Sequence, residues 1–383
     1  MKYFLTTLIC LSIYHNSIAQ LVPFRVNNLF GYSDAKGAIK IEPQYQNASF
    51  FKNELAFVEK DSLFYLINTK GEQLAGGFKY HGVYNSGFCN VVAPDNRTYY
   101  IDTKGKEAFK ELKNIEICEN FSENLAVIMV NKKLGIINTK GEWVRKPDFD
   151  TSSRVFQSGF LLAVSNGKYF FINKKGQTMK LNDSIFPASA FSENMAAVYV
   201  KRKSTEAPFN EVYTLQYIDT LGNIVLNKFI NEGLDYSEYI SPEADFRDGK
   251  AIVKTRNDMG WDYYFIDKKG AFSPLDSFAK HLGDSLFLGM LGVYMPDVRI
   301  LDKHLWVSGQ FQKNPVYVGI FNSKLLPVQN KEKKWGYMDN NCKLIIDFLY
   351  EGASDFDDGY AFVFKNGVSI CINKEGKEYY TFK

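Results

Sequence analysis

Residues 156–176 read FQSGFLLAVSNGKYFFINKKG and contain two short phrases that recur along the chain. The second phrase is a β-branched or aromatic run, then Asp or Asn, two further residues and Gly. It occurs eight times and ends at Gly37, Gly71, Gly105, Gly141, Gly176, Gly222, Gly270 and Gly376. The first five of these glycines are 34, 34, 36 and 35 residues apart. A fixed period of this length indicates supersecondary units that stack on their neighbours to bury an apolar face.

The first phrase is an aromatic residue, two polar residues, Gly or Asn, and then a run that contains Ala. In four units the Phe of this phrase precedes the Ile of the second phrase by sixteen residues, in the pairs Phe51 and Ile67, Phe121 and Ile137, Phe156 and Ile172, and Phe356 and Ile372. Because the two phrases keep one interval, they belong to a single repeated unit.

A hairpin is predicted between the two phrases. Asn166-Gly167 lies between two β-rich runs, and Asn366-Gly367 repeats this arrangement in the last unit. Asn-Gly favours a two-residue type I′ turn, in which both residues need positive φ. Other polar residues replace the pair elsewhere, as in Asp61-Ser62 and Asn131-Lys132-Lys133.

The second phrase is itself predicted to be a tight turn. Its Asp or Asn can accept a hydrogen bond from the backbone two residues on, and its Gly takes the left-handed conformation that closes the turn. A short third strand follows, as in residues 38–41 and 343–346. The predicted fold is therefore all-β, a tandem array of units of about 35 residues, each with three antiparallel strands and a longer return. Propeller-like blades, an open superhelix and a partly closed ring all fit this pattern.

The repeat weakens after Gly176. We divide the chain into regular repeats over 20–230, divergent repeats with insertions over 231–330, and further regular repeats over 331–383. Two insertions stand out, KRKSTEAPFNE at 201–211 and GLDYSEYISPEAD at 233–245. FNSKLLPVQ at 321–329 is interpreted as a unit whose turn glycine has become Leu325.

Residues 1–19 are predicted to be a signal peptide. Lys2 is followed by an apolar run from Phe4 to Ile13, and Ser17-Ile18-Ala19 fits the small-residue cleavage rule. The apolar run is too short for a membrane-spanning helix, which needs about 20 residues. We expect the protein to be exported to the periplasm, the cell surface or the medium, without a transmembrane segment.

The composition argues against several classes of function. Aromatic residues make up 16% of the chain, which favours β structure. The formal net charge is only +3 and the basic residues form no stripe, so nucleic acid is not an expected partner.

No residue pattern predicts a metal, a cofactor or a catalytic centre. Cys89, Cys118, Cys342 and Cys371 form no CxxC pair, although a bridge between Cys342 and Cys371 stays open. His81, His281 and His304 lack ligand-like neighbours and are interpreted as structural or surface residues. The repeated Asp and Asn of the turns are followed by Thr or Lys, and Lys would oppose a bound calcium ion.

The stretches WGYMD at 335–339, FGYSD at 30–34 and LGIIN at 134–138 precede turn phrases, and IEPQY at 41–45 precedes a copy of the first phrase. This composite pattern resembles the WG-containing repeat of bacterial proteins, over about 24–270 and 331–383. The resemblance implies a β-repeat fold and carries no catalytic motif.

Together these features favour an exported, non-catalytic β-repeat scaffold that binds a protein or a cell-envelope polymer. The alternative is a glycan-active enzyme with its site in the divergent segment 230–330. Within the insertion at 233–245, Tyr236 and Tyr239 are the candidate ligand- or partner-binding residues, because Tyr is enriched at interfaces.

Overall fold

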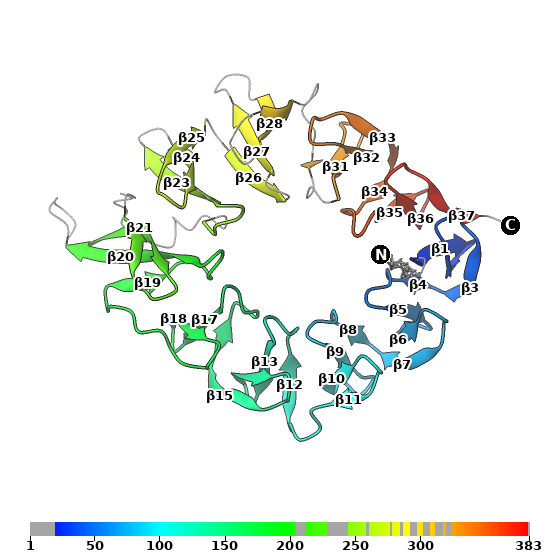
Figure 1. The fold of residues 1–383 in the computed structure, drawn as a ribbon, viewed down its shortest axis with the longest axis horizontal. Coiled ribbons are helices and arrows are strands. Elements are labelled where there is room, and N and C mark those ends of the chain that lie inside the picture. The colour runs from blue at the N-terminus through cyan, green and yellow to red at the C-terminus, as the bar shows by residue number, and fades with distance from the viewer. Residues whose placement is uncertain are drawn as a thin grey trace, which may run out of the picture.

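The computed structural model describes residues 20–203, 211–227, 244–257, 260–275, 278–283, 286–291, 297–301, 307–310, 317–318 and 323–381. These residues form 37 strands and no helix, so the all-β prediction is confirmed. The strands make small antiparallel sheets that follow one another around a ring, as the blades of a β-propeller do (Figure 1). Accordingly, no helix in the described part of the chain could cross a membrane.

We number the blades in chain order. Blade 1 contains β1 (Val22–Val26), β2 (Leu29–Ser33) and β3 (Ile39–Tyr45). Blade 2 contains β4 (Asn47–Ala48), β5 (Leu55–Lys60), β6 (Leu63–Asn68) and β7 (Gln73–Phe78). Blade 3 contains β8 (Tyr80–His81), β9 (Phe88–Val92), β10 (Thr98–Asp102) and β11 (Glu107–Ala108). Blade 4 contains β12 (Ile115–Cys118), β13 (Leu125–Val130), β14 (Lys133–Asn138) and β15 (Trp143–Phe149). Blade 5 contains β16 (Thr151–Ser152), β17 (Phe160–Ser165) and β18 (Lys168–Asn173).

The remaining blades lie on the other half of the ring. Blade 6 contains β19 (Ile185–Pro187), β20 (Met195–Lys203), β21 (Glu211–Asp219) and β22 (Ile224–Leu226). Blade 7 contains β23 (Lys250–Asn257), β24 (Gly260–Asp267) and β25 (Phe272–Leu275). Blade 8 contains β26 (Phe278–Gly283), β27 (Leu286–Leu291), β28 (Asp297–Leu301) and β29 (Val307–Gln310). Blade 9 contains β30 (Tyr317–Val318), β31 (Leu326–Gln329), β32 (Trp335–Met338) and β33 (Leu344–Tyr350). Blade 10 contains β34 (Gly352–Ala353), β35 (Tyr360–Lys365), β36 (Val368–Asn373) and β37 (Glu378–Thr381).

Both predicted turns are present in the unit. Asn166 and Gly167 have φ of 50° and 74°, as a type I′ turn requires. All eight glycines of the second phrase have positive φ, between 76° and 94°. In the first of these turns, Oδ1 of Asp34 accepts hydrogen bonds from the backbone N–H groups of Lys36 and Ala38, each at 3.0 Å.

The first phrase is also a type I′ turn, which the sequence pattern did not predict. In blade 4, Glu123 and Asn124 have φ of 50° and 67°. Ser122 and Leu125 exchange backbone hydrogen bonds across them. The return to the next blade adds a short innermost strand, such as β4, so that most blades have four strands rather than the three predicted.

The same turn corrects the interpretation of residues 321–329. Ser323 and Lys324 have φ of 53° and 71°, which match the values at Glu123 and Asn124. Leu325 is therefore the buried residue that follows this turn, and it does not replace a turn glycine.

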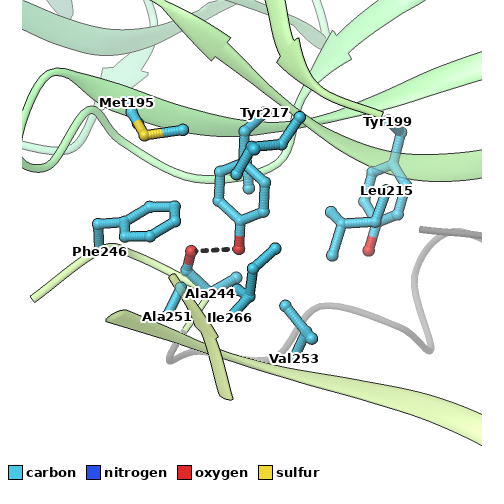
Figure 2. Close-up of a cluster of buried hydrophobic side chains, with 11 residues drawn as sticks. Met195, Tyr199, Leu215, Tyr217, Ala244, Phe246, Ala251, Val253 and Ile266 are labelled. Carbon is cyan, nitrogen blue, oxygen red and sulfur yellow. Dashed lines mark hydrogen bonds between the residues drawn. The ribbon is translucent and has the colours of Figure 1, made fainter. Parts of the chain in front are cut away.

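The hydrophobic core lies between neighbouring blades rather than within one sheet. A buried Tyr or Phe of one blade packs at ring-centroid distances of 4.7–5.1 Å on the Phe of the next blade's first phrase, in the pairs Tyr32–Phe51, Tyr100–Phe121, Phe171–Phe191, Tyr217–Phe246 and Tyr337–Phe356. Between blades 6 and 7 the hydroxyl of Tyr217 also donates a hydrogen bond to the carbonyl oxygen of Ala244, at 2.8 Å (Figure 2). Each pair therefore fixes the orientation of one blade against the next.

Hydrogen bonds between the first-phrase turns reinforce this packing. Glu123 of blade 4 accepts a bond from the backbone N–H of Gly159 in blade 5 at 3.0 Å. Glu193 of blade 6 accepts the same bond from Gly249 of blade 7, also at 3.0 Å. Because this glycine-to-glutamate hydrogen bond occurs at equivalent positions in two pairs of blades, it is a feature of the repeat.

The first and last blades join in one seven-stranded sheet, with the order β3-β2-β1-β37-β36-β35-β34. At the junction, Arg25 and Val26 of β1 pair in parallel with Tyr380 and Thr381 of β37. Asn27 donates a further backbone hydrogen bond to Thr381, at 3.0 Å. Of the arrangements that the sequence left open, the structure has propeller-like blades in a ring that is closed between its two chain ends (Figure 1).

The cysteines and the described histidine side chain have structural positions. Cys89, Cys118, Cys342 and Cys371 are all free thiols, so the bridge between Cys342 and Cys371 is not formed. The ring of His81 stacks on Phe57 at a centroid distance of 3.8 Å, and burial lowers the pKa of His81.

Candidate functional site

A groove with a volume of about 660 Å³ lies between blades 5 and 6. Strand β18 forms one wall, β19 forms the other, and the connection between them closes one end. The lining residues are Leu162, Gly167, Lys168, Tyr169, Phe170, Met179, Leu181, Asn182, Asp183, Ile185, Phe186, Pro187, Ala188 and Tyr199.

The groove exists because blade 5 lacks an outer strand. In blades 1, 2, 4 and 9 the outer strand ends in an aromatic residue that is at most 7% exposed. These residues and their partners on the neighbouring strand are Tyr45 with Phe30, Phe78 with Phe64, Phe149 with Leu134, and Tyr350 with Trp335.

Blade 5 has no aromatic residue at this position. Ala48 of β4 faces Val58, and Pro187 of β19 faces the equivalent Val198. Tyr45 lies three residues before Ala48, and Ser184 lies three residues before Pro187, so Ser184 occupies the position of Tyr45. The residue at the partner position in blade 5 is Tyr169, which is 54% exposed. The equivalent residues beneath an outer strand are less exposed: Phe30 and Leu134 are buried, and Phe64 and Trp335 are half-buried.

The backbone at the outer edge of β18 is only partly paired. Met179 donates to the carbonyl oxygen of Phe171 at 2.8 Å, and Thr178 forms an isolated bridge with Ile172. Tyr169 lies two residues before Phe171 and faces the same edge, because alternate residues of a strand direct their N–H and C=O groups to the same side. In the described residues the only strand partner of β18 is β17. The N–H and C=O groups of Tyr169 are therefore open to a ligand.

The side chains around the groove are apolar at the walls and basic at the rim. Phe186 is 40% exposed and makes an edge-on contact with Tyr213, at a centroid distance of 6.1 Å. Lys168 and Lys180 are exposed beside the groove. Asp183 is the only carboxyl group in the lining.

The lining contains one carboxyl group and neither His nor Cys. Glycoside hydrolysis needs two carboxyl groups that flank the bond, and the groove offers one. No cluster of three potential metal ligands occurs in the described part of the chain. The arrangement is suited to binding by apolar contact and backbone hydrogen bonds.

The two residues predicted to bind a partner, Tyr236 and Tyr239, lie outside the described residues, so their role stays a prediction. In the chain, the insertion at 201–211 lies between β20 and β21 of blade 6, and the insertion at 233–245 lies between β22 of blade 6 and β23 of blade 7. The strands β20 and β21 have nine residues each, compared with six in β13 and β14. The same blade forms one wall of the groove.

Sequence reasoning missed the groove itself. The available signal was an absence: Ser184 stands where four other units have an aromatic residue, three positions before the inner-strand residue equivalent to Ala48. Neither recurring phrase includes that position.

The WG containing repeat model matches residues 30–64, 100–133, 135–169 and 335–368. The chain contains WG repeats. Each WG repeat spans two blades, since residues 30–64 begin in β2 of blade 1 and end in β6 of blade 2. The third WG repeat ends at Tyr169, at the edge of the groove.

No curated protein sequence matches the chain. Among solved structures, the chain is similar to a eukaryotic initiation factor, with 13% identity, a TM-score of 0.47 and coverage of 94% of both chains. It is also similar to BamB from Moraxella catarrhalis, with 10% identity, a TM-score of 0.32 and coverage of 86% of this chain and 94% of the other. A third similar structure is Hsv2p from Kluyveromyces lactis, with 10% identity, a TM-score of 0.36 and coverage of 70% and 96%.

Proposed function

We propose that this WG-repeat protein is an exported, non-catalytic scaffold that binds a protein or a cell-envelope polymer in the groove between blades 5 and 6. One observation carries the proposal: Tyr169 is 54% exposed at a position that four other blades cover with an outer strand. Exposed aromatic side chains beside an apolar cleft are typical of binding sites.

The rest of the ring supports this role by holding the groove in shape. Phe171 of β18 is fully buried against Phe191 of blade 6, at a ring-centroid distance of 4.7 Å. The two walls are therefore fixed relative to each other before a partner arrives. A preformed site avoids part of the entropy cost of ordering on binding.

Export rests on residues 1–19, and amino-terminal sequencing of the protein recovered from its native cells tests it. A mature chain that begins at Gln20 is expected. A chain that begins at Met1 would contradict export by cleavage.

The binding site is tested by photo-crosslinking with a matched pair of positions. Benzoylphenylalanine is placed at Tyr169 in one variant and at Tyr80 in another. Tyr80 is equally exposed, at 53%, but lies on β8 of blade 3, away from the groove. Irradiation in a native envelope preparation should give a discrete adduct from position 169 and none from position 80.

A second pair of variants checks the same conclusion. Phe186→Ala should abolish the adduct at position 169, whereas Leu349→Ala, at a similarly exposed position of blade 9, should leave it unchanged. Equal adducts at positions 169 and 80, or none at either, would refute the proposal. Turnover of an envelope glycan by the purified protein would refute the non-catalytic part.

A further inference from the structure

We propose that the partner is an extended peptide that joins blade 5 as its missing outer strand, with an aromatic side chain opposite Tyr169. This inference rests on the proposed function and specifies the partner of the same groove. The other blades of the protein supply the template for the bound state.

The template is consistent in four blades. The outer strands β3, β7, β15 and β33 all pair antiparallel with the strand inside them. Each ends with an aromatic residue that packs between its own blade and the next. Phe149, for example, is fully buried in the cluster that joins blades 4 and 5. A peptide that copies such a strand would restore in blade 5 what the chain supplies elsewhere.

The backbone of blade 5 allows this addition over a short length. The part of the outer edge near Phe171 is taken by the bond from Met179. The edge at Tyr169 is open, so the peptide adds by a few residues and not along the whole strand. Main-chain hydrogen bonds of this kind give affinity, and the pockets for side chains give specificity.

The side chains of the groove explain why an aromatic residue is required. Leu162, Met179, Leu181 and Ile185 pack only partly buried at the edge of the cluster that joins blades 5 and 6. In blades 1, 2, 4 and 9 the buried aromatic ring of the outer strand completes the equivalent cluster. A peptide ring that enters the groove would cover these apolar surfaces together with the face of Tyr169.

The charges at the rim favour an acidic peptide. Lys168 and Lys180 are exposed beside the groove. The lining itself contains one carboxyl group, that of Asp183. Acidic residues beside the aromatic anchor would therefore be attracted to the site.

The experiment uses a peptide taken from the protein's own outer strands. LIIDFLYE is the sequence of residues 344–351, which contains β33, two acidic residues and the aromatic Tyr350. A fluorescent form of this octapeptide is titrated with the purified protein and followed by anisotropy. We expect saturable binding, weakened at least about tenfold when Ala replaces the Tyr of the peptide and at least about tenfold by Tyr169→Ala in the protein.

The mode of binding is tested with modified peptides and unchanged protein, so that the result does not depend on whether a protein variant folds. N-methylation of one peptide nitrogen at a time removes one donor at each position. An added strand directs alternate N–H groups toward its neighbour. We therefore expect alternate N-methyl peptides to lose binding and the intervening ones to keep it. Equal affinity for the Tyr and Ala peptides, or a uniform response to N-methylation, would overturn the inference.

The two proposals fail separately. If Tyr169 forms its specific adduct in the envelope preparation but no strand peptide binds, the inference is wrong and the scaffold function stands, with a partner that does not add as a strand. If the peptides bind in the alternating pattern but no adduct forms, the groove accepts strands as inferred and the proposed envelope partner is wrong.

Discussion

Two glycines of blade 5 have almost the same backbone conformation and very different surroundings. Gly176 has φ of 76° and Gly167 has φ of 74°. A Cβ atom added to Gly176 would lie 2.4 Å from the carbonyl oxygen of Val144, on β15 of blade 4. A Cβ atom added to Gly167 would meet nothing within 4 Å. Substitution by Ala at the two positions therefore separates backbone strain from the contact between blades.

The expected magnitudes follow from these distances. A left-handed conformation costs a non-glycine residue about 1–2 kcal/mol, and both variants bear this cost. At Gly176 the new methyl group overlaps a backbone atom that cannot rotate away, so blade 5 must shift against blade 4. Overpacking of this kind costs roughly 1–3 kcal/mol more. We expect Gly167→Ala to lower the free energy of unfolding by about 1–2 kcal/mol and Gly176→Ala by about 2–5 kcal/mol.

Equilibrium unfolding in urea, followed by tryptophan fluorescence and by circular dichroism, measures both variants against the parent protein. Gly222→Ala is a useful third variant, because its φ is 85° and its nearest neighbour would lie at 3.4 Å. It should behave like Gly167→Ala. If Gly176→Ala and Gly167→Ala destabilise the protein equally, the close approach of the turn to the preceding blade does not contribute to stability, and our account of blade packing is wrong.

Three further predictions concern single groups. Tyr217→Phe should lower the free energy of unfolding by about 1–3 kcal/mol, because the buried carbonyl of Ala244 loses its hydrogen-bond donor. In the same urea titration, Tyr169→Phe should have no measurable effect, because the side chain of Tyr169 is exposed. Hydrogen bonds from the turn backbone lower the pKa of Asp34 in the folded protein. The carboxylate of Asp34 therefore stabilises the fold above its ordinary pKa of 3.8, and this contribution is lost as the pH falls through the lower folded pKa. Asp34→Asn should remove this part of the acid sensitivity when unfolding is measured from pH 6 to pH 2. Burial raises the pKa of Cys342 to about 12, yet Cys342 is the only partly exposed residue of the four described cysteines. Cys342 should therefore react with a thiol reagent before Cys89, Cys118 and Cys371. Faster labelling of any of these three would contradict their burial between the blades.

The turns could be predicted from the sequence because each turn has its own local chemistry. Asn-Gly at 166–167 and the Asp-x-x-Gly phrase at 34–37 state which residues must have positive φ. The type I′ turn at Glu123-Asn124 has the same backbone but lacks Gly. Asn tolerates the left-handed region, while Glu gives no such signal, so the phrase was recognised and its conformation was not.

The closure of the ring and the groove depend on contacts between distant parts of the chain. Nothing in the residues of β1 or β37 marks them as partners, because their pairing is between backbone groups more than 350 residues apart. The groove arises from a side chain that blade 5 does not have, and a repeat pattern built from shared residues does not record what is missing. The local sequence therefore predicts the strands and turns of each blade, whereas ring closure and the groove depend on which blades lie next to each other.

The parallel pairing of β1 with β37 has a mechanical consequence. The chain enters the ring at Val22 and leaves it at Thr381, so a pull on the two ends draws the two strands past each other in opposite directions along their length. A load in that direction stretches all the bonds of the junction together, whereas a perpendicular load would open them one after another. If the protein is held at one end and pulled at the other, the β1–β37 pair therefore resists as a shear joint, and the other blades bear the force only after this pairing has ruptured.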